Sequence, residues 1–96
     1  MSSVADIESY VEYCGPQLLR AMLDVFRMED VNIVDFKTMA VKLPTAGHFE
    51  GSKNDACAYL KVISNNEALM EEFGVSFDAM KQEFTVSEDV LSVLRF

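Results

Sequence analysis

The sequence is short of the side chains that carry most enzyme chemistry. It has one histidine (His48), two cysteines (Cys14 and Cys57) and no tryptophan among its 96 residues. The cysteines form no CxxC pair, and these three residues do not match the ligand spacings of zinc sites. A Cys57–His48 pair is conceivable as an activated nucleophile, but no third residue supports it. We therefore expect a protein that is not an enzyme, with no catalytic residue, no metal and no cofactor.

Positive charge is also scarce. Eight Lys and Arg residues stand against sixteen Asp and Glu residues, for a net charge of −8. Such a chain repels phosphate backbones and anionic lipid headgroups, which disfavours direct binding to nucleic acid. The acids gather in residues 1–30 and 62–96, and the middle is close to neutral. Two interpretations stay open: the acids keep a small domain soluble, or they form a face that meets a basic partner or imitates a nucleic acid.

Long hydrophobic runs are missing as well. None approaches the roughly twenty residues that a membrane span requires. The N-terminal segment MSSVADIESY has neither the basic start nor the apolar centre of a secretory signal. Two cysteines without a disulfide framework fit a reducing compartment, although a Cys14–Cys57 disulfide stays open. We expect a cytoplasmic protein that makes no contact with a membrane.

What the sequence does contain is an ordinary globular composition. Half of the residues are apolar and a quarter are charged, which is typical of a folded chain rather than a disordered one. A chain of this length buries roughly three-fifths of its unfolded surface without cross-links. With no linker and no repeat, residues 1–96 are predicted to form a single compact domain.

Helices are predicted at both ends of the chain. Apolar spacing indicates one helix before residue 15, and we expect Gly15-Pro16 to end it and start the next. The second helix, residues 16–28, is the most apolar and should occupy the centre of the core. A last helix within residues 85–96 can be capped by Thr85 or by Ser87. The core stripe of the second helix consists of Leu18, Leu19, Met22, Leu23 and Phe26.

The middle of the chain is ambiguous. Residues 31–43 are rich in strand-favouring types, but a helix over residues 35–43 fits nearly as well. Residues 58–63 can be the returning strand of a hairpin or part of a helix capped at Ser52 or Asn54. The fold class we expect is mainly α, with four to five short helices and a small antiparallel β-hairpin within residues 31–63. An all-α bundle is the alternative.

The stretch from residue 64 to residue 84 is predicted to be a helix, a tight turn and a second helix. Ser64 and Glu67 have the spacing of a capping box, and Gly74 is the glycine expected just past a helix end. Ser76 can cap the second helix. Its apolar side would be formed by Phe77, Met80 and Phe84.

This stretch resembles the helix-turn-helix of bacterial DNA-binding domains, on the turn Phe73-Gly74-Val75-Ser76. The resemblance implies a DNA-binding regulator whose recognition helix would be residues 77–84. That helix carries one lysine and two acids, whereas a helix that enters the major groove needs hydrogen-bond donors.

A longer resemblance runs from Leu60 to the end of the chain. The run Glu71-Glu72-Phe73-Gly74 and the Thr85-Val86 lead into the last helix are similar to the second half of acyl carrier proteins. The resemblance implies a helical carrier, but Tyr59 stands where that family has the serine that bears phosphopantetheine. A degenerate carrier-like domain is therefore one alternative function, and the DNA-binding regulator is another.

The function we expect is that of a small acidic protein-interaction module. It would be an inhibitor or adaptor, of the nucleic-acid-mimic or anti-defence type, that occupies a basic surface of a protein partner. Self-association through its apolar anchors stays open. Met and aromatic side chains are typical of interface centres, and acids would surround them. The candidate partner-binding residues are Glu67, Glu71, Glu72, Asp78, Met80, Glu83 and Phe84.

Overall fold

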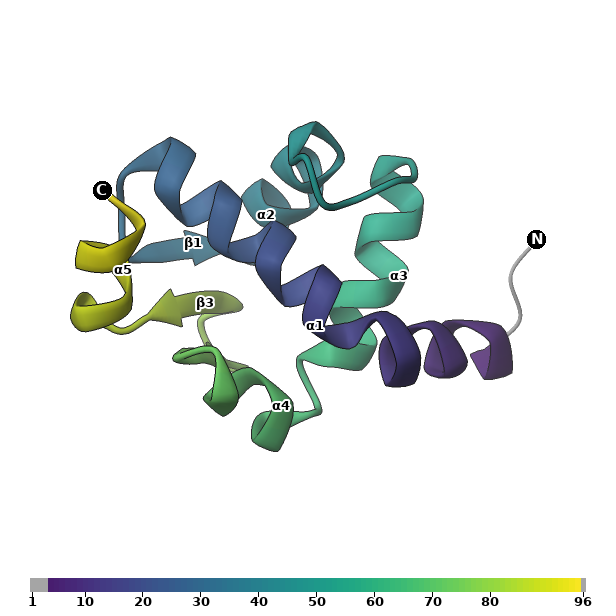
Figure 1. Cartoon of the computed structure of the whole chain (residues 1–96). Coiled ribbons are helices and arrows are strands. Elements are labelled where there is room, and N and C mark those ends of the chain that lie inside the picture. Colours follow the sequence, from purple (N-terminus) through teal and green to yellow (C-terminus); the bar gives the residue numbers. More distant parts are fainter. Residues whose placement is uncertain (1–3, 96) are drawn as a thin grey trace.

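The chain forms a mainly helical fold with a small antiparallel sheet (Figure 1). A computed structural model describes the backbone of residues 4–95 and, within this range, the side chains of residue 11 and of residues 13–95. The expected fold class is confirmed. In chain order the elements are α1 (Val4–Glu29), β1 (Ile33–Asp35), α2 (Phe36–Lys42), the 3-10 turn η1 (Leu43–Thr45), α3 (Lys53–Ile63), α4 (Glu67–Glu72), β2 (Val75–Asp78), β3 (Glu83–Val86) and α5 (Glu88–Leu94).

The first two predicted helices are one continuous helix, α1, with Pro16 inside it. The prediction that Gly15-Pro16 separates them is therefore wrong. Proline removes one backbone N–H and favours a bend, and α1 changes direction near its middle in Figure 1. Gly15 is buried, and a Cβ atom placed on it would lie 2.5 Å from Cδ2 of Leu69. This glycine serves close packing of α1 against α4 rather than helix termination.

The second half of α1 is the centre of the core, as the sequence predicts. Leu18, Leu19, Met22 and Phe26 are fully buried, and Leu23 is half-buried. Their stripe faces several partners, since α1 packs against α2, α3, α4 and α5. Figure 1 shows α1 crossing the molecule from beside α3 to the side that carries α5.

The ambiguous middle contains both a strand and a helix. Residues 33–35 form β1, and Asp35 then caps α2 by accepting a hydrogen bond from the backbone N–H of Thr38 at 3.4 Å. Residues 53–63 form α3, capped by Ser52 in a capping box with Asp55. The hairpin expected within residues 31–63 is therefore not formed there, because β1 pairs with β3 from the far end of the chain.

The predicted capping box at Ser64 is wrong, since α3 extends up to this residue and Ser64 is its C-cap. Asn66 caps α4 instead, accepting a hydrogen bond from the N–H of Leu69 at 3.2 Å. The predicted role of Gly74 is confirmed. It follows the end of α4 with φ of +72°, a conformation that favours glycine.

Residues 75–86 form a β-hairpin, not the second helix that the sequence analysis predicts. Strands β2 and β3 pair antiparallel, with Val75 opposite Val86 and Phe77 opposite Phe84. The arrangement of two helices around a turn, on which the helix-turn-helix resemblance depends, is absent from residues 64–84. Ser87 caps α5 by accepting from the N–H of Val90 at 3.3 Å, as predicted.

The sheet has the order β1-β3-β2, so that β3 is central. Its inner face carries a row of Val34, Phe84 and Phe77, directly opposite one another. The Phe77 and Phe84 ring centroids lie 4.6 Å apart, and Phe36 stacks on Phe84 at 6.0 Å. Phe84 has no exposed surface. This aromatic cluster fixes the hairpin against the helical core.

Replacing Gly74 by alanine tests the turn between α4 and β2. The φ of +72° is strained for alanine, and the new Cβ would lie 2.7 Å from Cγ2 of Val90. We expect Gly74→Ala to lower the free energy of unfolding by more than about 1 kcal/mol, measured by urea denaturation. Gly47→Ala is the matched control, because nothing lies within 4 Å of its added Cβ. Equal midpoints for the two variants would contradict this account of the turn.

Candidate functional site

The outer face of the sheet carries a row of three carboxylates. Glu83 on the central strand lies directly opposite Asp35 on β1 and Asp78 on β2. Side chains alternate between the two faces of a strand, so the inward positions of the buried Val34 and Phe84 and of the half-buried Phe77 turn these acids outward. Like charges directly opposite each other destabilise a sheet. We call these three residues the carboxylate row.

Two members of the row also have a structural task. Hydrogen bonding to Thr38, through its side chain first and also through its backbone, lowers the pKa of Asp35 against the opposing effect of desolvation. Asp78 accepts hydrogen bonds from the backbone N–H groups of Met80 and Lys81, at 3.0 and 3.1 Å. The bonds to Asp35 favour its ionised form. Capping and turn formation explain Asp35 and Asp78, but they do not explain a third acid between them.

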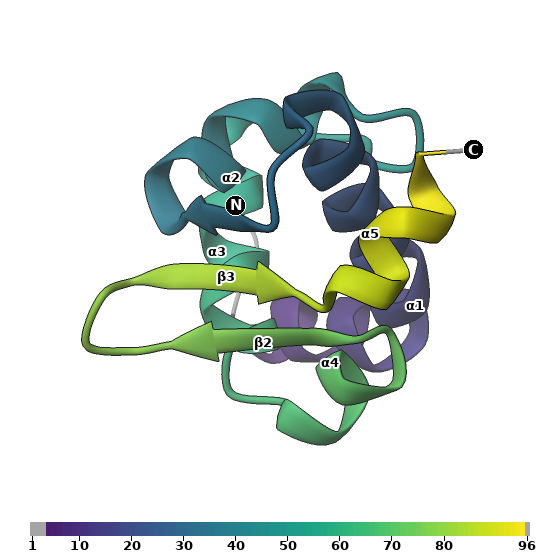
Figure 2. The same ribbon diagram turned by 90° about the vertical axis from the view of Figure 1, so that its left-hand side faces the viewer.

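Met80 stands at the tip of the hairpin with 96% of its surface exposed. The turn beneath it is ordered by Asp78 and by a 2.7 Å hydrogen bond from Nε2 of Gln82 to the carbonyl of Ala79. Gln82 itself has φ of +54°. Figure 2 shows this turn projecting beyond α2 and α3. The tip therefore presents an apolar side chain on a defined backbone.

Phe84 is not an exposed anchor, although the sequence analysis groups it with Met80. Its side chain is fully buried in the aromatic cluster with Phe36 and Phe77. Phe77, Met80 and Phe84 would share one face if the segment were a helix, because their spacing matches the helical repeat. In the hairpin, Met80 belongs to the turn and Phe84 to the inner face.

Helix α4 places its acids beside the hairpin. Glu67, Glu71 and Glu72 are all exposed, and α4 lies alongside β2 in Figure 2. Glu67 and Glu71, with Met70 and Val75 and also Ser76 and Phe77, line a pocket of about 220 Å³ between α4 and β2. We call it the α4–β2 pocket. Of the seven predicted partner-binding residues, six thus lie on α4 and the hairpin outside the core, and five of these six are exposed, whereas Glu83 is half-buried.

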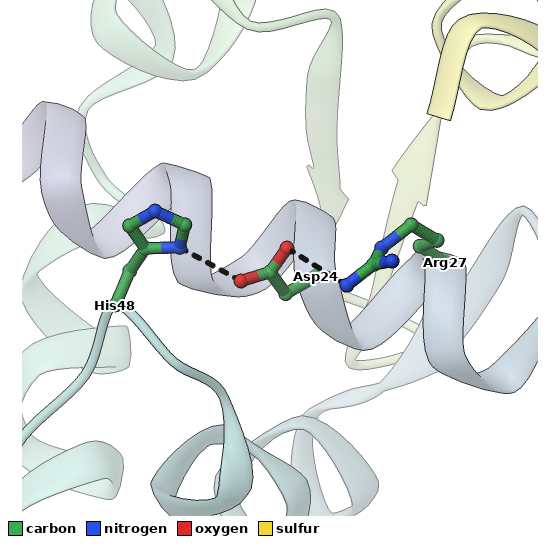
Figure 3. Close-up of polar contacts among 3 residues, drawn as sticks. All are labelled: Asp24, Arg27 and His48. Atoms are coloured by element: carbon green, nitrogen blue, oxygen red, sulfur yellow. Dashed lines mark hydrogen bonds and ion pairs between the residues drawn. The ribbon is translucent and has the colours of Figure 1, made fainter. Parts of the chain in front are cut away.

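The only histidine lies away from this region. Nδ1 of His48 is 2.7 Å from Oδ2 of Asp24, and Arg27 approaches the other carboxylate oxygen at 3.6 Å (Figure 3). This contact ties the loop after η1 to α1. His48 is thus paired with a carboxylate rather than with Cys57, and both Cys14 and Cys57 are free thiols.

The described part of the chain shows neither a metal site nor a helix that could span a membrane. Across the residues with described side chains, no group of three or more His, Cys, Asp and Glu is placed to hold a metal ion. No helix within residues 4–95 combines the length and the apolar character needed to cross a membrane. Comparisons of the chain with models of protein families, with curated proteins and with solved structures gave no match. The proposal for its function therefore depends on the chain's own geometry.

Removing the central charge of the carboxylate row should stabilise the protein. Glu83→Gln relieves repulsion with Asp35 and Asp78, and we expect the free energy of unfolding at pH 7 and low salt to rise by about 0.2–1 kcal/mol. The measurement is urea denaturation, repeated at about 1 M salt, where screening should abolish most of the gain.

Glu50→Gln is the control for the general effect of reducing the net charge, because Glu50 is exposed in a loop outside the sheet. A gain from Glu83→Gln no larger than that of the control, or a gain unaffected by salt, would contradict repulsion within the row.

Proposed function

We propose that this chain is a non-enzymatic protein-interaction module of the cytoplasm that occupies a basic surface of a protein partner, as an inhibitor or adaptor. One observation carries the proposal: an exposed methionine, Met80, is held on an ordered turn next to a row of carboxylates. Interfaces commonly combine an apolar anchor at the centre with a polar rim. The free thiols of Cys14 and Cys57 support a reducing environment.

Met80 is suited to the role of anchor. It is more exposed than any other large apolar side chain among the described residues. An unbranched thioether adapts its shape to a partner's pocket. Because the turn is already ordered by Asp78 and Gln82, binding would cost little further backbone entropy.

The acids around Met80 supply charge complementarity to a basic surface of the partner. Residues 67–86 contain five acids and one lysine. The ion pairs of the described side chains lie elsewhere, at Asp24, Glu29 and Asp30. The acids of α4 and the hairpin are therefore available to a partner. Clustered charge of one sign steers an oppositely charged partner and accelerates association, more strongly at low salt.

The partner is proposed to be a different protein rather than a second copy. Two copies meeting through this region would bring like charges together, which is unfavourable. No observation favours the other candidate functions. Tyr59, at the position of the carrier serine, is half-buried and packs edge-on against Phe49 at 6.0 Å. Residues 77–84, the would-be recognition helix, lie in the hairpin.

The proposal is tested by quantitative affinity capture from cells that naturally contain the protein. We expect Met80→Ala, and separately Glu71→Lys with Glu72→Lys, to weaken retention of the partner by about five- to thirtyfold, since interface anchors contribute roughly 1–2 kcal/mol or more each. Retention by the wild type should fall as salt is raised.

Two controls match these changes. Val93→Ala shortens an apolar side chain that is 71% exposed on α5, and Glu50→Lys reverses a charge in a loop. Both should retain the partner as the wild type does. The proposal is wrong if Met80→Ala and the double lysine variant bind as tightly as these controls, with the same dependence on salt.

A further inference from the structure

The α4–β2 pocket lies along the free edge of the sheet. It is lined by three consecutive residues of β2: Val75, Ser76 and Phe77. Consecutive residues of a strand point to opposite faces, so a pocket that touches all three runs beside the strand rather than over one face. Since β3 is the one strand that pairs with β2 among residues 4–95, the other edge of β2 faces the pocket.

The hydrogen-bond pattern shows which backbone groups face that edge. The N–H of Ser87 donates to the carbonyl of Gly74 at 2.9 Å, and these residues continue the register in which Ser76 lies opposite Thr85. Hydrogen-bonded and non-hydrogen-bonded pairs alternate along an antiparallel ladder. Ser76 therefore bonds to β3, whereas the N–H and C=O groups of Val75 and Phe77 point away from β3.

Those outward groups have no hydrogen-bond partner among the described residues. The backbone of Val75 is close to the end of α4, and its side chain is buried. Phe77 lies further along the hairpin and is only half-buried. The edge of β2 at Phe77 is therefore able to pair with an added strand, the mode in which many domains bind an extended peptide.

The pocket also has a charged rim over an apolar floor. Met70 and Val75 are 1% and 4% exposed, and the half-buried Phe77 also lines the pocket. Glu67 and Glu71 stand one helical turn apart on the same side of α4, where side chains four residues apart are neighbours. Neither carboxylate takes part in an ion pair among the described side chains.

The volume of the α4–β2 pocket limits it to a small occupant. At about 220 Å³ the pocket is below the roughly 300–1,000 Å³ of typical cofactor and small-molecule sites. It suits one long side chain. An apolar stem fits the floor of Met70 and Val75, and a cationic end fits the two glutamates.

We propose that the partner presents an extended segment that adds to the edge of β2 at Phe77 and places an arginine side chain in the α4–β2 pocket. The guanidinium carries several N–H donors in one plane, which allows it to bond Glu67 and Glu71 together and to stack on Phe77. A lysine has a single, more strongly hydrated charge and cannot do both.

This inference rests on the proposed function, because it names the chemistry by which the basic partner is recognised. It adds a second contact to that of Met80. The hairpin would then bind through its tip and through its edge, with the carboxylate row between them on the outer face.

The test is a titration of the full ¹⁵N-labelled chain, followed by NMR, with the blocked peptide acetyl-Val-Thr-Arg-Thr-Val-amide. We expect saturable shifts centred on the amides of Glu71, Ser76 and Phe77, with the Phe77 N–H moving as a newly hydrogen-bonded amide does. The same peptide with citrulline in place of arginine keeps the length and planarity but lacks the charge. It should bind at least about fivefold more weakly.

The variant pair Glu67→Gln with Glu71→Gln should weaken the arginine peptide by about five- to thirtyfold. Glu50→Gln with Glu88→Gln removes the same charge at two exposed residues outside the pocket and should leave binding unchanged. The inference is overturned if the arginine and citrulline peptides bind equally, if the two variant pairs behave alike, or if the shifts lie away from β2.

This outcome is distinguishable from failure of the proposed function. If the natural partner still depends on Met80 and on salt, but the Glu67→Gln with Glu71→Gln variant retains it as well as the control pair does, only the pocket assignment is wrong. If neither Met80 nor the acids affect the partner, the proposed function itself fails.

Discussion

Burial of Phe84 between Val34 and Phe77 is the constraint on which the rest of the structure depends. A strand has a period of two residues, so fixing one side chain inward fixes the direction of all the others, and a slip of one residue would reverse every one of them. With Phe84 inward on the central strand, Glu83 and Thr85 must face outward. The aromatic cluster therefore determines the outer surface as well as the core.

The proposed binding features follow from this register. Because Asp35 and Asp78 are the outward residues opposite Glu83, the three strands bring together acids that are far apart in sequence. The same alternation sends the backbone groups of Phe77 toward the α4–β2 pocket. Gly15 contributes to the position of α4, because its missing side chain lets Leu69 of α4 pack closely on α1. Core packing thus positions α4 beside β2.

The sequence predicts those features that depend on local rules. The buried stripe of α1, the glycine at position 74 and the cap at Ser87 all follow from residue type and spacing. Residue type and spacing do not predict the hairpin. Phe77 and Phe84 are seven residues apart, which is about two turns of a helix. The same separation also fits two residues that face each other across a hairpin. The alternation of apolar and polar residues in Val-Ser-Phe-Asp and Glu-Phe-Thr-Val is the local signal for strands. The choice between a helix and a hairpin also depends on pairing with β1, some fifty residues away in the sequence. The carboxylate row has no local signal.

Residues 75–86 form a hairpin with an inward aromatic pair and one free edge. Amide hydrogen exchange, resolved by NMR at each residue, tests this arrangement most directly. We expect slow exchange for Ser76 and Thr85, which bond each other, and for Phe84, which bonds β1. We expect faster exchange for Phe77, whose N–H faces the open edge. Uniform protection from Ser76 to Phe84, as in a helix, would contradict the account.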